Sequence, residues 1–112
     1  MGFYNPTDWL SGVPRPKSSR RLVYENEIMF LTIDMEPGYK AVPHKHTWPT
    51  LYYVTAGSGR ALVGDEWRDV EAGTLVMVPA ESMHAIEAVT NVSIVEVQAN
   101  CPQQFVNGVL GK

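Results

Sequence analysis

Residues 38–46 read Gly-Tyr-Lys-Ala-Val-Pro-His-Lys-His and place two of the three histidines of the chain, His44 and His46, one residue apart. The third, His84, follows a second apolar run that contains glycine and proline, residues 73–79. In a β-strand, side chains two positions apart point to the same face about 6.5 Å from each other, so His44 and His46 can converge on one ion. Neutral imidazole binds Zn, Fe, Cu and Ni and is acceptable to Mn. The stretch therefore predicts a metal site, although the pair alone is equally consistent with a half-exposed polar edge.

Length and composition predict one globular domain. The chain has 112 residues, of which 45% are hydrophobic and 19% charged, which is ordinary for a folded domain. A formal net charge of −3 argues against binding to nucleic acid or to an anionic membrane. The basic residues between Arg15 and Arg21 are interrupted by Pro16, and we interpret them as a solvated arm. The lone Cys101 makes no internal disulfide, so we expect a reducing, cytoplasmic location.

The chain divides into three parts by its pattern of turn residues. Residues 1–20 contain Pro6, Pro14 and Pro16 and predict an extended N-terminal arm. Residues 21–100 alternate short β-type runs with turns and predict an antiparallel barrel, and residues 101–112 form a C-terminal tail. No stretch sustains helical periodicity, so the fold class is all-β. The predicted strands are residues 22–24, 28–35, 40–46, 51–55, 59–63, 66–70, 74–78, 84–88 and 92–99.

The spacing of glycines and histidines resembles that of the cupins, which are small β-barrels with two sequence motifs. The first motif, G-x5-H-x-H-x3,4-E-x6-G, is matched in spacing by Gly38, His44, His46, Thr50 and Gly57. The second, G-x5-P-x-G-x2-H-x3-N, is matched in spacing by Gly73, Pro79, Glu81, His84 and Ala88. The resemblance covers about residues 28–98 and implies an antiparallel double-stranded β-helix, also called a jelly-roll barrel.

Three positions depart from the cupin motifs. Thr50 stands where cupins place a ligating Glu or Gln, Glu81 replaces a glycine, and Ala88 replaces an asparagine. A neutral hydroxyl is a poor ligand, so the resemblance implies a centre of three histidines alone, as in cupins that are thiol or diketone dioxygenases. The implied cofactor is one divalent transition metal; we favour Fe²⁺, with Mn²⁺, Ni²⁺ and Zn²⁺ as alternatives.

The missing carboxylate affects the charge of the predicted site. Three neutral imidazoles leave the +2 charge of a divalent ion uncompensated inside a barrel of low dielectric constant. Such a site favours a bidentate anion, such as an enolate, a carboxylate or a thiolate. It also acidifies a bound water or substrate.

Two further residues are candidates for catalysis. Tyr52 has the parity of Thr50 and is expected to face the same lumen, where its phenol can donate a hydrogen bond or act as a weak acid. The alternative is that Tyr52 fills the barrel. Glu81 lies in the turn before His84 and can serve as a general base or cap the site; the alternative is an exposed carboxylate.

The walls of the predicted pocket are assigned from position along the strands. Trp48 follows the two histidines and is expected at the rim of the pocket. Thr50 stands where cupins place a fourth ligand, and Ile86, two residues after His84, is expected on the same face of the strand. Phe30 and Met77 come from strands expected to border the cavity. Together they predict an apolar pocket.

The sequence supports several functions for such a protein. We favour an enzyme that acts on a small acidic chelating molecule, first as a dioxygenase and next as a metal-assisted isomerase, cyclase or lyase. The alternatives are a non-catalytic cupin that binds or senses a small ligand, and a purely structural barrel. We expect a homodimer, in which two copies pair through their sheet edges with help from the proline-rich arm.

Overall fold

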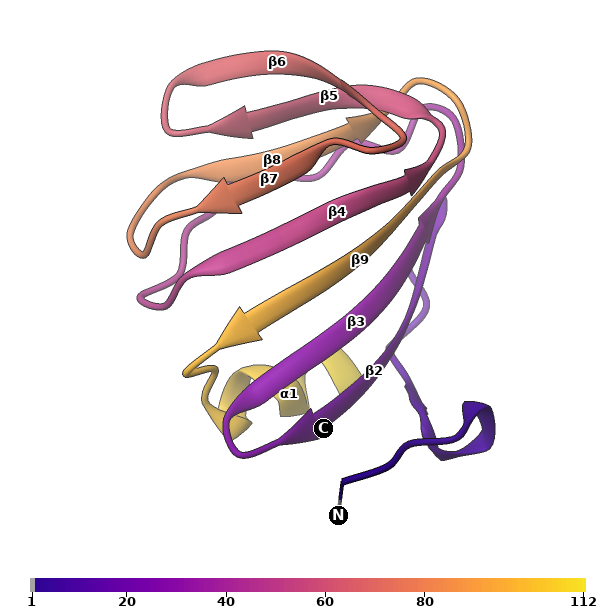
Figure 1. Cartoon of the computed structure of the whole chain (residues 1–112), viewed down its shortest axis with the longest axis vertical. Helices are drawn as coiled ribbons and strands as arrows, with labels where there is room; N and C mark the ends of the chain where they lie inside the picture. Colours follow the sequence, from indigo (N-terminus) through magenta and orange to yellow (C-terminus); the bar gives the residue numbers. More distant parts are fainter. Residues whose placement is uncertain (1) are drawn as a thin grey trace.

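Two antiparallel sheets face each other in the computed structural model, which describes residues 2–112 (Figure 1). The larger sheet has the order β1-β2-β3-β9-β4-β7 and the smaller has the order β6-β5-β8. The all-β, antiparallel fold class expected from the sequence is therefore confirmed. Strands and helices are Leu10–Ser11 (β1), Ser18–Glu25 (β2), Ile28–Met35 (β3), Thr50–Ala56 (β4), Ser58–Val63 (β5), Glu66–Glu71 (β6), Leu75–Val78 (β7), His84–Ala88 (β8), Val92–Ala99 (β9), a 3-10 turn Pro6–Asp8 (η1) and Gln103–Leu110 (α1).

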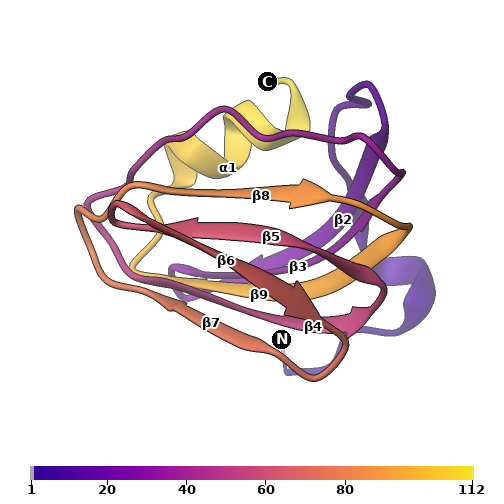
Figure 2. The same cartoon turned by 90° about the horizontal axis from the view of Figure 1, so that it is seen from above.

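The predicted strand at residues 40–46 does not form a continuous strand. It runs along β8 through two isolated bridges, Lys40 with Glu87 and His44 with His84 (Figure 2). Pro43 lies between these bridges, and because proline has no backbone N–H it cannot contribute a donor to a ladder. The segment nevertheless holds both of its histidines beside the first residue of β8.

The core lies between the two sheets and follows the two-residue period of the strands. On β3, the buried positions are Met29, Leu31, Ile33 and Met35. On β9 the same inward face carries Val92 and Ile94 and then two polar residues, whose role is described below. Side chains on alternate positions point to opposite faces, so the inner face of each strand is set by this parity.

Gly57 connects β4 to β5 where the chain passes close to the turn between β8 and β9. Its φ is +87°, and a Cβ added there would lie 1.8 Å from the Asn91 carbonyl oxygen. Gly64 opens the next hairpin with a φ of +68°, as expected from its place between two strands. Both positions need the left-handed backbone that glycine adopts without strain, and only Gly57 is also enclosed by backbone.

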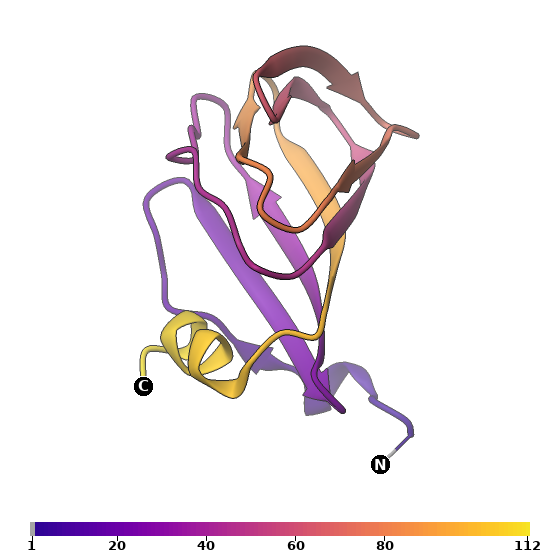
Figure 3. The same ribbon diagram turned by 90° about the vertical axis from the view of Figure 1, so that its left-hand side faces the viewer.

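The N-terminal arm and the C-terminal helix contact each other beside the barrel. In the arm, β1 pairs with β2 of the same chain, and the Val13 N–H donates to the Val109 carbonyl oxygen at 2.8 Å. Residues 101–112, expected as a tail, contain α1, which lies next to β2 and β3 (Figure 3). The helix begins after Pro102 and ends at Gly111 in the left-handed conformation, with Val106 and Val109 buried. Within residues 2–112, no helix is long and apolar enough to span a bilayer.

Candidate metal centre and its cavity

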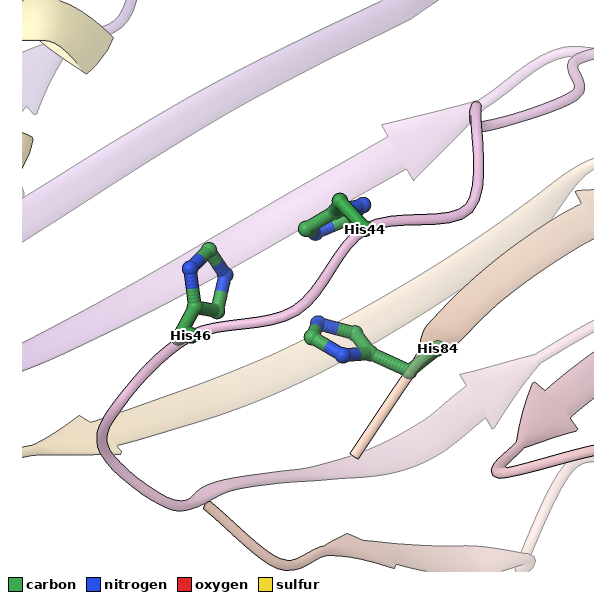
Figure 4. Close-up of side chains that lie close together, drawn as sticks. All are labelled: His44, His46 and His84. Carbon is green, nitrogen blue, oxygen red and sulfur yellow. The ribbon is translucent and has the colours of Figure 1, made fainter. Parts of the chain in front are cut away.

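Three histidine side chains converge from two segments of the chain (Figure 4). His44 and His46 come from the segment between β3 and β4, and His84 is the first residue of β8. Two backbone hydrogen bonds, of 3.1 and 2.8 Å, join His44 and His84 in both directions and fix them as neighbours. The imidazole nitrogens available as ligands lie within 4.8 Å of one another.

Each of the three imidazole rings is held in place by contacts with other residues. The Nδ1 atoms of His44 and His84 lie 2.9 and 3.1 Å from the carbonyl oxygens of Val42 and Ser82. When Nδ1–H donates to a carbonyl, Nε2 keeps its lone pair for a metal. The His46 ring stacks on Trp48, with centroids 4.8 Å apart, and Phe105 packs edge-on against it. The site is thus preorganised by residues outside the ligand set, including one from α1.

Burial keeps the imidazoles of His46 and His84 neutral. It lowers the pKa of His46 to about 4, and repulsion from His44 and His84 adds to the effect. The pKa of His84 is also lowered, mainly by burial. A neutral imidazole is the form that binds a metal, so these two residues need not lose protons near neutral pH.

The depressed pKa of His46 predicts how the metal-free chain responds to acid. In the unfolded chain, His46 titrates near 6.5, whereas in the folded chain it titrates near 4, so between these values the unfolded state binds more protons. The contribution of His46 to stability is present above pH 6.5 and is lost as the pH falls towards 4. We expect the free energy of unfolding of the wild type, relative to a His46→Gln variant, to fall as the pH is lowered from 6.5 to 4.

The measurement is denaturant unfolding in the presence of a chelator at several pH values between 8 and 4. The difference between the two chains is needed because burial raises the pKa of Glu96, which acts on stability with the opposite sign. A difference that stays constant with pH would contradict the prediction.

The three histidines fit a divalent transition metal. Metal–imidazole bonds are about 2.0–2.1 Å long, so nitrogens on one ion lie no more than about 4.2 Å apart, and a small rotation of the side chains closes the site. No carboxylate or thiolate joins the cluster in the part of the chain that the structure describes. Thr50 is buried, and its Oγ1 has no hydrogen-bond partner among the described residues. The donor set is therefore three neutral nitrogens.

A cavity of about 980 Å³ opens between the sheets beside the histidines. All three histidines line it, and its apolar wall comes from both sheets. The apolar wall includes Met29, Leu31, Ile33, Met35, Ile86 and Ile94. Its polar interior consists of Tyr52, Glu96 and Gln98. A largely apolar pocket with a few convergent polar groups is the usual form of a small-molecule site.

Two hydrogen bonds connect Trp48, which stacks on the His46 ring, to an acid inside this cavity. Trp48 Nε1 donates to Gln98 Oε1 at 2.8 Å, and Gln98 Nε2 donates to Glu96 Oε2 at 2.7 Å. Because the indole N–H is only a donor, it fixes which end of the Gln98 amide faces Glu96. Burial raises the pKa of Glu96, and the bond from Gln98 opposes that rise.

Tyr52 lies directly across from Glu96 on the neighbouring strand β4. Its side chain is 3% exposed, and its hydroxyl has no hydrogen-bond partner among residues 2–112. Burial raises the pKa of this phenol, so it remains a proton donor at physiological pH. A buried hydroxyl without a partner is costly, which indicates that it is satisfied when the cavity is filled.

The other predicted site residues lie at different distances from the cavity. Ile86 lines the cavity, whereas Trp48 lies behind His46 and supports its ring. Glu81 is exposed with a φ of +69°, and its N–H donates to the His46 carbonyl oxygen, so it reaches the site through its backbone alone.

Phe30 and Met77 do not line the cavity, contrary to the expectation from the sequence. Met77 is 60% exposed on the outer face of β7, and Phe30 packs against Trp9 of the arm. Strand β3 does border the cavity, but through the residues of opposite parity to Phe30, such as Met29. No residue of β7 lines the cavity, and its inward-facing Val76 belongs to the core.

Glu96 and Gln98 were not predicted from the sequence as site residues. The available signal was their parity, because they continue the inward series of Val92 and Ile94 with two polar side chains. A carboxylate at a core-facing position is uncommon without a partner or a function.

Comparison with known proteins agrees with this geometry. A family model described as a cupin domain matches residues 31–106. An RmlC-like cupin from Shewanella frigidimarina has a TM-score of 0.84 and 18% identity, covering 94% of this chain and 96% of that one. KdgF from Halomonas sp. has a TM-score of 0.82 and 17% identity, with coverage of 93% and 99%.

The polyketide cyclase RemF from Streptomyces resistomycificus has a TM-score of 0.73 and 18% identity, with coverage of 89% and 80%. At these identities the likeness shows the fold alone, and the expected jelly-roll barrel is confirmed. No curated protein matches the chain in sequence.

Proposed function

The chain belongs to the cupin domain family, and from that premise we propose that it is a metal-dependent enzyme acting on a small anionic molecule. His44, His46 and His84 would hold the ion. A divalent ion there supplies a Lewis acid that polarises a carbonyl or stabilises an enolate, which Fe²⁺, Mn²⁺, Ni²⁺ and Zn²⁺ can all do. The cavity beside the histidines supports the proposal, since it holds both apolar and proton-donating groups.

The observation that carries the reaction class is the pair formed by Glu96 and Tyr52. A half-buried carboxyl with a raised pKa faces a phenol that has no partner among the described residues, and both line the cavity that the histidines line. Oxygenation of a chelated substrate needs no such pair, whereas proton transfer does. The geometry therefore favours an isomerase, cyclase or lyase over the dioxygenase that we favoured from the sequence.

Each side chain has a defined part in the proposed reaction. Glu96, as carboxylate, takes a proton from the carbon next to a carbonyl and, as carboxylic acid, returns it to another atom of the substrate. Tyr52 donates a hydrogen bond to the oxygen that becomes negative. Gln98 holds Glu96 in place through its amide. The apolar wall limits the number of water molecules around the substrate.

The expected effect of Glu96→Gln tests this assignment. In deuterated water, the metal-loaded wild type should catalyse exchange of the C3 protons of 2-oxoglutarate, followed by NMR, and the variant should be at least about 100-fold slower. Metal affinity should be unchanged, because Glu96 is not part of the histidine cluster. Glu71→Gln, at an exposed position on β6, is the matched control and should exchange at the wild-type rate.

Undiminished exchange in the Glu96→Gln variant would refute the assignment of Glu96. Oxygen consumption with β-diketones or thiols would instead support a dioxygenase, the second candidate, which the donor set of three neutral nitrogens favours because it leaves positions for both substrate and oxygen. Ligand binding without either reaction would support a non-catalytic binding protein.

We further propose that the protein is a cytoplasmic homodimer. The strand β7 is one edge of the larger sheet, and its outer face exposes Leu75 and Met77, 54% and 60% exposed, beside Tyr53 of β4. An apolar patch on a sheet edge supports pairing between copies. The single Cys101 is buried and unpaired, which supports a reducing compartment.

A further inference from the structure

The charge of the cavity differs in sign from that of the whole chain. The chain carries a net charge of −3, yet the ionisable residues that line the cavity, other than the histidines and Tyr residues, are four cations and one carboxylate. The carboxylate is Glu96, and the cations are Arg15, Lys17, Arg20 and Lys40. An acidic protein that gathers its cations around one cavity attracts anions to it. The basic segment interpreted from the sequence as a solvated arm thus forms part of the cavity wall.

Among these cations, Arg20 is the one placed inside the barrel. It lies on β2 with the inward parity of Leu22, whereas Arg15, Lys17 and Lys40 are exposed. Its Nε is buried and has no hydrogen-bond partner among the described residues. Within residues 2–112, no carboxylate lies at ion-pair distance from its guanidinium; its polar neighbours are Tyr39 and, at longer range, Glu96. A half-buried guanidinium with no anion at ion-pair distance is a costly arrangement unless a ligand completes it.

The register of the larger sheet relates Arg20 to Gln98, which is linked to the histidines through Trp48. Arg20 pairs with Ile33, which pairs with Ile94 on β9, so these three residues lie side by side across the sheet. Gln98 lies four residues further along β9. The offset is about 13 Å along the strands and about 10 Å across two strand spacings, and the long side chain of Arg20 covers part of it.

Glu96 occupies the space between these two ends. It interacts electrostatically with both Arg20 and His44, and it lies between Ile94 and Gln98 on the inward face of β9. A ligand that reached from the histidines to Arg20 would therefore pass the proton-transfer pair in the middle of the cavity.

We propose that Arg20 binds a second anionic group of the same ligand, a carboxylate, so that the substrate is a small molecule with a chelating head at one end and a carboxylate at the other. The planar fork of a guanidinium matches the two oxygens of a carboxylate and makes the pair directional. This inference rests on the proposed function, because the histidine centre must hold the chelating head. It goes further by making Arg20 the residue that determines specificity.

The test compares three 2-oxo acids on the Co²⁺-loaded protein, followed by the visible spectrum of the metal. 2-Oxovalerate has the chelating head alone, while 2-oxoglutarate and 2-oxoadipate add a distal carboxylate at two spacings. We expect at least one diacid to bind about tenfold more tightly than the monoacid. Arg20→Gln should remove that preference and leave the affinity for 2-oxovalerate within about twofold of the wild type.

Two further variants keep the test decisive. Arg20→Lys retains the charge without the fork and should preserve only part of the preference, and it replaces Arg20→Gln if that chain fails to fold. Lys40→Gln, at an exposed position of the cavity mouth, should weaken all three acids to a similar small extent.

Equal affinities for monoacid and diacids in the wild type would overturn the role of Arg20 while leaving the proposed function intact. An equal loss for all three acids in Arg20→Gln would do the same. If no 2-oxo acid changes the Co²⁺ spectrum, the proposed function fails first, and this inference fails with it.

Discussion

Replacing His84 with alanine is expected to abolish stoichiometric metal binding. The loss removes one of the three proposed ligands, and among the described residues no carboxylate or thiolate joins the cluster to take its place. Loss of a hydrogen bond that merely supports a metal ligand costs 10–100-fold in affinity, so loss of a ligand should exceed about 100-fold. Metal content of the purified chain, and titration with Mn²⁺, Ni²⁺, Zn²⁺ and anaerobic Fe²⁺, measure this directly.

Lys45→Ala is the matched control, because Lys45 stands between His44 and His46 and is exposed. It should bind metal as the wild type does. Thermal unfolding gives a second readout: at a free metal concentration 1,000 times the Kd, binding stabilises the wild type by about 4.1 kcal/mol, and the His84→Ala variant should gain almost nothing. One tightly bound ion per chain in the variant would show that the three-histidine centre is not the metal site.

The second large effect is expected at Gly57, where alanine should destabilise the fold by at least about 3 kcal/mol. Two causes add at this position. A φ of +87° is unfavourable for any residue with a Cβ, and the Cβ would lie 1.8 Å from the Asn91 carbonyl oxygen and 2.8 Å from its carbonyl carbon. The obstruction is backbone, so no side-chain rotation relieves it. Denaturant unfolding followed by tryptophan fluorescence measures the loss.

Gly64→Ala separates the two causes. Gly64 has a comparable φ of +68°, but the nearest atom to an added Cβ is the Ser82 Oγ at 3.9 Å. Its cost should be confined to backbone strain, about 1–2 kcal/mol. Equal losses in the two variants would mean that the β4–β5 connection relaxes away from residue 91.

The sequence predicted the parts of this molecule that depend on local pattern. The strands β3, β8 and β9 have the predicted bounds because alternating apolar residues flanked by turn residues specify them. The three histidines could be predicted because their spacing from glycine and proline matches the two cupin motifs. Backbone pairing between His44 and His84 then places the two motifs side by side in the structure.

The face that a strand buries could not be predicted where both faces are apolar. On β3, Phe30 alternates with Met29 and Leu31; the inward set packs in the core, and Trp9 of the arm covers Phe30 on the outward face. Met77 on β7 is apolar yet exposed, so hydrophobicity alone placed it on the wrong side. Such choices are made by tertiary packing, which a local pattern does not contain.

Glu96 and α1 were missed for different physical reasons. Glu96 contributes no motif, and its significance depends on Gln98 and Tyr52, which only the sheet brings beside it. The helix has eight residues and includes Gly108, so its intrinsic helical preference is weak. It is stabilised by packing, through the buried side chains of Val106 and Val109.

The position of α1 has an evolutionary consequence. Gln104, Phe105, Gly108 and Val109 line the cavity, yet they belong to a helix that follows the last strand and contributes to no sheet. A side chain placed at Gly108 would meet no atom within 4 Å. Substitutions at Gln104 and Gly108 can therefore alter which molecules the pocket admits while strand pairing and the contact of Phe105 with His46 are kept. Ligand preference in such barrels is free to diverge faster than the fold.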